Sequence, residues 1–378
     1  MTKKNMLAID GGAKTLPTPL PAWPKFDRRT DRRVLEILHS GRVNYWTGSI
    51  GHEFETAFAQ WLGCKYAISV TNGTAALHVA LAALGIGSGD EVICTPYSFI
   101  ASSFCALQAG AMPVFCYVGE DHILDAAKLE ALITPRTKAI VPVHVYGNVC
   151  DVAGFDRLGE KYGVKIIYDA AHAFGIRDGE SPRSIATRGD MSMFSFHPTK
   201  LFHSCEGGCL VFKDAALQDK LFNLRNFAIV SETECVDVGS NAKMNELQAL
   251  MGLCCLKKIN DLLAWRKAIS DAYAAAFAGS PVRYLGGASG NHAYCPVLFK
   301  DEATREKVYD ELKAKCNVFS RRYFYPTLTE FAPYIYGKGS CPVAEDASRR
   351  VLTLPTYYGL EPSAATEIAK CVLEIARA

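Results

Sequence analysis

The segment Val164-Lys165-Ile166-Ile167-Tyr168-Asp169-Ala170-Ala171-His172 places an acidic residue directly after a short apolar run. Such a run, rich in β-branched side chains, is typical of a strand that is buried on both faces of a parallel sheet. Asp169 would then stand at the carboxyl end of this strand, which is the edge where open α/β sheets bind ligands. Taken alone, Asp169 is also explained as a helix cap or a loop residue, so its meaning depends on the segments around it.

Similar apolar runs alternate with helical patterns from residue 54 to about residue 212. This alternation predicts an α/β fold with a mostly parallel sheet that helices cover on both faces. The expected strands are Tyr66–Val70, Glu91–Cys94, Met112–Tyr117, Ala139–Val143, Val164–Tyr168 and Cys209–Phe212, and the expected helices between them include Ala75–Leu84 and Phe155–Tyr162.

The chain divides by composition into three parts. Residues 1–25 are rich in Gly and Pro and predict an extended N-terminal arm. Residues 26–261 contain the alternating strands and helices and predict a large domain, whereas residues 262–378 predict a smaller α+β C-terminal domain. At roughly 150 residues per domain, a chain of this length agrees with two domains.

The charges and cysteines exclude several classes of protein. Lys and Arg number 41 and Asp and Glu number 39, a net charge of +2 that does not suit a nucleic-acid binder. No long uncharged apolar run predicts a membrane-spanning helix, and Asp10 interrupts the start of the chain before a signal-peptide core develops. The 14 cysteines form no CxxC pair, which indicates reduced thiols in a cytoplasmic protein. No His and Cys set has metal-binding spacing, so we expect no metal.

A second chemical signal is the segment Phe194-Ser195-Phe196-His197-Pro198-Thr199-Lys200, which is followed by Glu206-Gly207-Gly208. An apolar run delivers a serine here, and a lysine follows it five positions later. A lysine that is partly withdrawn from water can supply a neutral amine as a nucleophile. The ordinary alternative is a surface lysine beside a proline turn.

Two further segments follow expected strands. Thr71-Asn72-Gly73-Thr74-Ala75-Ala76 would open a helix and present backbone N–H groups to a phosphate, although an ordinary helix cap explains it as well. Pro96-Tyr97-Ser98-Phe99 offers an aromatic side chain at another strand end, although a lone Phe is also explained by core packing.

Together these groups match the requirements of pyridoxal phosphate. In this interpretation Lys200 bonds covalently to the cofactor, and Asp169 keeps the pyridine nitrogen protonated so that the ring can accept electrons. A helix N-terminus would anchor the phosphate.

In order and spacing these motifs resemble the DegT/DnrJ/StrS-type sugar aminotransferase family of fold-type-I pyridoxal phosphate enzymes. The likeness extends from about Gly11 to the C-terminus. It rests on eight landmarks, which are Asn44-Tyr45-Trp46-Thr47-Gly48, the turn at 71–76, Gly87-Ser88-Gly89-Asp90-Glu91-Val92-Ile93, Thr134-Pro135-Arg136-Thr137-Lys138-Ala139-Ile140, Pro142-Val143-His144-Val145-Tyr146-Gly147, the segment 169–172, the segment 194–200 with 206–208, and Arg321-Arg322-Tyr323-Phe324-Tyr325-Pro326.

The resemblance implies a role for each matching residue. Lys200 would be the Schiff-base lysine and the base that moves the proton during transamination. Asp169 would pair with the pyridine nitrogen, and His172 would approach the phenolic oxygen of the ring. The other implied cofactor contacts are Phe99 stacking on the ring, Gly73, Thr74 and Ser195 at the phosphate, and Asn241 reaching the phosphate of a neighbouring subunit.

The role of Asn241 implies a homodimer with shared active sites. Weaker matches suggest substrate contacts at Thr47, Tyr146, His197, Arg321 and Arg322.

The departures from the family pattern bear on the substrate. Ala242 and Lys243 stand where many members have an aromatic residue and Arg. This resembles viosamine-type dTDP-4-amino-4,6-dideoxyglucose transaminases and implies glutamate as donor and dTDP-4-keto-6-deoxyglucose as acceptor, in deoxyamino sugar biosynthesis. The arm with Gly11, Gly12 and Trp23 instead resembles the aminocyclitol and aminohydroxybenzoate branches.

Other activities therefore stay open. One is an aminotransferase for a C3 keto sugar, a UDP- or GDP-linked sugar or an aminocyclitol. A sugar dehydratase of the family would carry His in place of Lys200. A non-catalytic regulator would have lost a residue of the site, and the site residues named above are all present.

Overall fold

The computed structural model describes residues 6–20, 24, 26–286 and 290–378, and it divides into two compact units. The large unit comprises residues 26–259, and the small unit combines residues 260–378 with the described part of residues 1–25. Trp23, which belongs to the predicted arm, lies outside the described residues.

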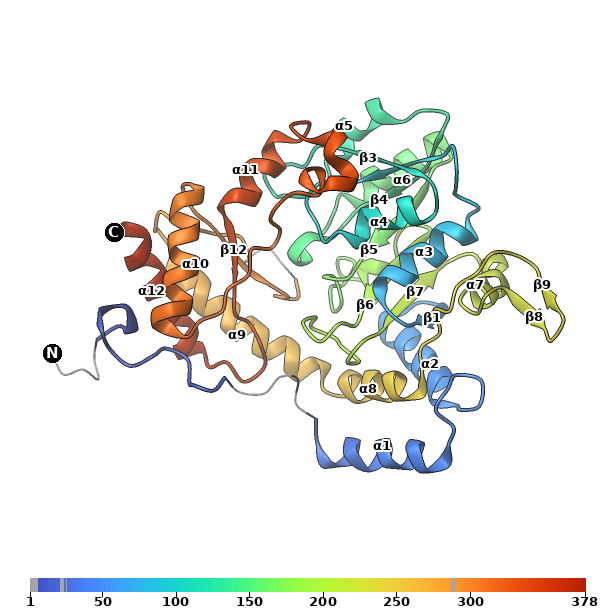
Figure 1. Cartoon of the computed structure of the whole chain (residues 1–378), viewed down its shortest axis with the longest axis horizontal. Helices are drawn as coiled ribbons and strands as arrows, with labels where there is room; N and C mark the ends of the chain where they lie inside the picture. Colours follow the sequence, from blue (N-terminus) through green and yellow to red (C-terminus); the bar gives the residue numbers. More distant parts are fainter. Residues whose placement is uncertain (1–5, 21–23, 25, 287–289) are drawn as a thin grey trace. The chain divides into compact units, whose positions relative to one another are not determined.

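The large unit is built on a mixed sheet of seven strands (Figure 1). Their order across the sheet is β1-β7-β6-β5-β4-β2-β3. The five strands from β6 to β3 run parallel, and β7 is antiparallel to both of its neighbours. The strands are β1 (Tyr66–Val70), β2 (Glu91–Cys94), β3 (Met112–Phe115), β4 (Thr137–Val141), β5 (Lys165–Asp169), β6 (Met191–Ser195) and β7 (Gly208–Phe212).

Both faces of this sheet are buried, as the apolar runs predict. In β4, Ala139 and Val141 belong to one hydrophobic cluster, whereas Ile140 between them belongs to another cluster on the opposite face. This alternation follows from the two-residue period of a strand. The helices of this unit are α1 (Arg28–Ser40), α2 (Ile50–Leu62), α3 (Gly73–Ala83), α4 (Ala101–Gln108), α5 (Ala126–Leu129), α6 (Val152–Tyr162), α7 (Gln218–Leu224) and α8 (Glu246–Leu256).

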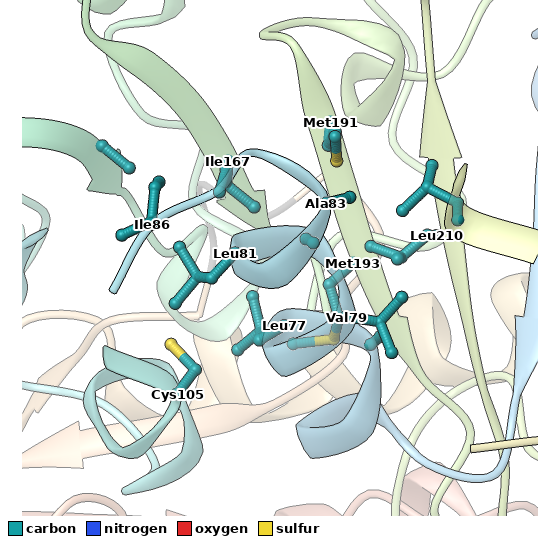
Figure 2. Packing of buried hydrophobic residues seen from close by; sticks show 14 of the residues in the cluster. Leu77, Val79, Leu81, Ala83, Ile86, Cys105, Ile167, Met191, Met193 and Leu210 are labelled. Atoms are coloured by element: carbon teal, nitrogen blue, oxygen red, sulfur yellow. The ribbon is translucent and has the colours of Figure 1, made fainter. Parts of the chain in front are cut away.

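Helix α3 fixes the position of the site, because it is apolar nearly all round and packs on the middle of the sheet. Figure 2 shows Leu77 and Val79 of α3 among Met193 of β6 and Leu210 of β7. A helix that is apolar on most of its surface is buried rather than amphipathic. Its N-terminus is therefore held at the strand ends by a continuous core.

A two-stranded hairpin, β8 (Ile229–Ser231) and β9 (Glu234–Cys235), projects from the large unit beyond α7 (Figure 1). This hairpin was not predicted from the sequence.

The small unit contains a three-stranded antiparallel sheet in the order β10-β11-β12. Its elements are β10 (Arg283–Tyr284), β11 (Cys295–Leu298), β12 (Val351–Leu354), α9 (Ile259–Phe277), α10 (Glu302–Cys316), α11 (Pro342–Arg350) and α12 (Pro362–Arg377). Ala8 and Leu16 of the N-terminal segment pack into the core of this unit. In the described part of the chain, no helix is long and apolar enough to cross a membrane.

Candidate active site

Asp169 ends strand β5 and is 4% exposed. One carboxylate oxygen accepts a hydrogen bond from the N–H of Ala171 at 3.0 Å, and the other accepts one from the hydroxyl of Ser102 at 2.7 Å. Burial raises the pKa of Asp169, while these two hydrogen bonds and the nearby charge of Lys200 lower it. The carboxylate is thus withdrawn from water and stabilised by partners that favour its charged form.

Lys200 lies in the turn that follows β6, where its backbone N–H donates to the carbonyl of His197 at 2.9 Å. Its side chain is half-buried. The ammonium group is close enough to lower the pKa of both Asp169 and His172. Because β5 and β6 are parallel neighbours, the lysine, the carboxylate and the imidazole all stand where these two strands end at the same edge of the sheet.

His172 follows β5 and is buried. Its Nδ1 accepts a hydrogen bond from the backbone N–H of Tyr146 at 3.1 Å, so the neutral ring carries its proton on Nε2. Burial holds the pKa of His172 well below 6.5, and the nearby charge of Lys200 lowers it further. The ring is therefore a neutral hydrogen-bond donor.

Tyr146 has a φ of 59° and is fully buried. Its hydroxyl shares a hydrogen bond of 2.6 Å with the hydroxyl of Tyr97. The structure thus shows its backbone orienting His172, and the substrate contact suggested by the sequence remains a prediction.

The N-terminus of α3 forms a turn against the end of β6. The side chain of Asn72 caps the helix by accepting from the N–H of Ala75 at 2.8 Å. The N–H groups of Gly73 and Thr74 come before this capped position, and such first-turn amides have no acceptor inside a helix. They stand at the positive end of the helix dipole, which favours an anion.

Two glycines let this turn approach the sheet closely. A Cβ at residue 73 would lie 2.9 Å from the Cβ of Ser195. A Cβ at Gly208, which pairs with Ser195 across the sheet, would lie 2.8 Å from the backbone nitrogen of Gly73. The predicted phosphate-binding residues Gly73 and Ser195 are therefore direct neighbours.

Two predicted cofactor residues are exposed in the single chain. Phe99 precedes α4 and is 52% exposed. Asn241 is exposed, and its carbonyl oxygen accepts a hydrogen bond from Lys243 Nζ at 2.7 Å.

The structure gives other contacts for the remaining residues that are predicted to bind substrate. Thr47 is exposed, and its N–H donates to the side chain of Asn44 at 3.1 Å. His197 is exposed, and its Nε2 lies 3.7 Å from Oε1 of Glu206.

Arg321 and Arg322 belong to the small unit. The Arg322 guanidinium pairs with Glu306 and lies over the ring of Tyr309 at 3.8 Å from its centre.

Sequence reasoning missed Ser98 and Ser102, which lie behind Asp169. The available signal was a pair of hydroxyl residues four positions apart at the start of a helix that follows an expected strand. It also missed Glu246, which is buried and accepts hydrogen bonds from the N–H groups of Ile50 and Gly51.

The fold and the site define the class of this protein: it has the fold of the type-I pyridoxal phosphate aminotransferases. The solved structure of DesI with its TDP-sugar product matches it with a TM-score of 0.87 and 32% identity, covering 99% of this chain and 97% of that chain. The chain belongs to the DegT/DnrJ/EryC1/StrS aminotransferase family, whose model matches residues 24–373.

Two relatives illustrate the range of the family. A dTDP-4-amino-4,6-dideoxy-D-glucose transaminase of Shigella dysenteriae is 35% identical over 90% of this chain and 94% of that protein. A GDP-perosamine synthase of Caulobacter vibrioides is 36% identical over 91% of this chain and 95% of that protein. These findings confirm the predicted family, fold type, aminotransferase chemistry and pyridoxal phosphate cofactor.

Proposed function

We propose that this chain transfers the amino group of glutamate to a keto sugar carried on a nucleoside diphosphate, with dTDP-4-keto-6-deoxyglucose as the best acceptor. The observation that carries the proposal is the buried, hydrogen-bonded carboxylate of Asp169 at the end of β5, beside the parallel strand β6 that leads to Lys200. The relatives named above act on dTDP- and GDP-linked amino sugars. A third relative is named for spore coat polysaccharide biosynthesis, which supports a role in polysaccharide or deoxyamino sugar synthesis.

The residues present fit the cofactor. Asp169 offers a buried carboxylate for the protonated pyridine nitrogen, and His172 offers Nε2–H to the phenolic oxygen. The amides of Gly73 and Thr74 with the hydroxyl of Ser195 suit a phosphate. Phe99 would cover one face of the ring.

Each residue has a task in the reaction. When bound, pyridoxal phosphate supplies an electron sink for the substrate carbon that loses its proton. Lys200 carries that proton, as a base when its amine is neutral and as an acid afterwards. Asp169 holds the compensating negative charge, and His172 remains neutral because burial opposes its protonation. Thr47, Tyr146, His197, Arg321 and Arg322 are proposed to contact the substrate.

We propose that the active unit is a homodimer in which Asn241 reaches the partner's phosphate site. Asn241 lies beside the β8–β9 hairpin, where apolar side chains are exposed and Val238 is 88% exposed. A cluster of exposed apolar residues is typical of a protein–protein contact. The exposed large apolar residues of this hairpin region are Phe227, Ile229, Val230, Val236 and Val238.

We also propose a cytoplasmic location. It is supported by the scattered cysteines, all of which are free thiols in the structure.

A panel of acceptors tests the substrate. The enzyme is incubated with glutamate and dTDP-, UDP- or GDP-linked keto sugars, and the mass change from ketone to amine is measured. The proposal predicts the fastest conversion with dTDP-4-keto-6-deoxyglucose. A clear preference for a UDP- or GDP-linked sugar, or for a cyclitol, would contradict it, and Lys200→Ala serves as the inactive control.

A further inference from the structure

Behind the carboxylate of Asp169 lies a chain of two serine hydroxyls. Ser102, in the first turn of α4, is 2.7 Å from one carboxylate oxygen, and Ser98 is 2.9 Å from Ser102. Ser102 is fully buried, and Ser98 is 4% exposed. The contact between Ser102 and Asp169 joins residues that are 67 positions apart in the sequence.

The direction of these hydrogen bonds follows from the charge. An ionised carboxylate can only accept hydrogen bonds, so the hydroxyl proton of Ser102 points to Asp169. The oxygen of Ser102 is then an acceptor for the hydroxyl of Ser98. Hydrogen bonds aligned in this way polarise one another, and a donor to a charged acceptor is stronger than one to a neutral acceptor.

The two carboxylate oxygens are held from different sides. Ala171 donates to one of them from the turn after β5, and Ser102 donates to the other from α4. Each carboxylate oxygen can accept a second hydrogen bond. The carboxylate therefore has a fixed plane and keeps acceptor capacity for a ligand.

Other ionisable groups surround Asp169, and all of them must be considered in its titration. Lys200 favours the carboxylate, whereas burial disfavours it. The neighbouring groups come from the turn after β6, the turn after β5, α4 and the segments after β4, and they are Lys200, His172, Cys105, Cys150 and His144.

We propose that Ser102, supported by Ser98, is a positioning residue that keeps the Asp169 carboxylate ionised and oriented for the pyridine nitrogen of the cofactor. This proposal rests on the proposed function. Without Ser102, only Ala171 and Lys200 would oppose the effect of burial on the carboxylate. The protonated form of Asp169 would then become more populated, and this uncharged form cannot stabilise a protonated ring nitrogen.

The test is the pH dependence of cofactor binding to the apoenzyme. Pyridoxal 5′-phosphate is titrated into wild-type, Ser102→Ala, Ser102→Thr and Ser103→Ala proteins, and the dissociation constant is followed by absorbance. In Ser102→Ala we expect binding to weaken about tenfold near neutral pH, the loss of one hydrogen bond to a charged group. We also expect the acidic limit of binding to move up by about one pH unit. Ser102→Thr, which retains the hydroxyl, should restore both values.

Ser103→Ala is the matched control. Ser103 is buried in the same helix, but its hydroxyl donates to the backbone carbonyl of Ile100 at 3.3 Å. A purely structural role for Ser102 would lower thermal stability without moving the acidic limit. If Ser102→Ala does not fold, the Ser98→Ala protein is used in its place. Its acidic limit of cofactor binding should move in the same direction by a smaller amount.

An unchanged acidic limit in Ser102→Ala, or in Ser98→Ala when that variant decides, would overturn the proposal. Asp169→Asn separates this failure from a failure of the proposed function. If Asp169→Asn abolishes the pH dependence while Ser102→Ala leaves it unchanged, only the role of Ser102 is wrong. If Asp169→Asn binds the cofactor like the wild type, the role of Asp169 itself is wrong.

Discussion

Gly73 and Ser195 are in such close contact that a single methyl group cannot be inserted between them. A Cβ at residue 73 would lie 2.9 Å from the Ser195 Cβ and 3.0 Å from the sulfur of Met193. The contact joins the N-terminus of α3 to the end of β6. The amides and the hydroxyl proposed to bind phosphate are thereby held in one place before the cofactor arrives.

We therefore expect Gly73→Ala to impair cofactor binding. The new methyl group must push α3 away from β6, because besides the movable sulfur of Met193 it meets the Cβ and Cα of Ser195, which are fixed to the strand. Overpacking of this kind costs about 1–3 kcal/mol of unfolding free energy, and displacement of the amides should raise the pyridoxal phosphate dissociation constant about tenfold or more. Equilibrium unfolding and a cofactor titration measure the two effects.

Gly87→Ala is the control for this prediction, since its Cβ would meet nothing closer than the carbonyl of Ala109 at 3.4 Å. Equal cofactor affinity in Gly73→Ala and the wild type would show that the close contact has no part in binding.

His144 should make the protein less stable in acid. Burial lowers the pKa of His144 to about 4, whereas an unfolded histidine has a pKa of about 6.5. As the pH falls through this interval, the unfolded chain takes up a proton that the folded chain does not bind, so folding loses stability. Between about pH 7.5 and about pH 5, His144 alone should cost about 2 kcal/mol.

His144→Phe tests this effect by urea unfolding at the two pH values. The ring of Phe can still stack on Tyr168, as the His144 ring does at 4.9 Å between centres. Loss of the acceptor for the Cys150 N–H lowers stability at both pH values. The difference in unfolding free energy between the two pH values should shrink by about 2 kcal/mol. An undiminished pH difference in His144→Phe would refute the linkage.

Mixed dimers should regain activity if Asn241 serves the partner's site. Lys200→Ala and Asn241→Ala proteins are each expected to be nearly inactive. A hybrid of the two contains one site with both defects and one with none, because the two residues would come from different subunits. After random exchange of subunits, about a quarter of all sites should be native.

The measurement is transaminase activity before and after subunits are mixed and allowed to exchange. Native mass spectrometry with one of the two variants isotopically labelled serves to show that exchange occurs, because the hybrid dimer has an intermediate mass. Full exchange without any recovery would place Lys200 and Asn241 in the same subunit's site, or outside any shared site.

The sequence predicted the parts of the molecule that depend on local pattern. Buried parallel strands such as β2 and β5 are continuous apolar runs, and their ends locate Asp169 without knowledge of the tertiary structure. The antiparallel direction of β7 could not be predicted from the sequence, because strand direction depends on pairing between distant segments. The hairpin β8–β9 was missed because its strands are short and exposed.

The site shows the same difference between features set by local sequence pattern and features set by distant contacts. Lys200, Asp169 and Gly73 stand in motifs, so their residue types and spacing suggested their chemistry. The contact from Ser102 to Asp169 joins a helix and a strand across 67 residues of chain, so the local spacing of Ser98 and Ser102 alone could not show that they reach this carboxylate. The positive φ of Tyr146, which turns its N–H toward His172, is set by the surrounding packing.

The most direct test of the account is to find where the cofactor attaches. The enzyme loaded with pyridoxal phosphate is treated with sodium borohydride, digested, and the peptides are examined by mass spectrometry. We expect a stable pyridoxyl phosphate group on Lys200 and none in the Lys200→Ala protein. A label on another lysine, or equal labelling of the wild type and Lys200→Ala, would contradict the central claim that Lys200 is the catalytic amine.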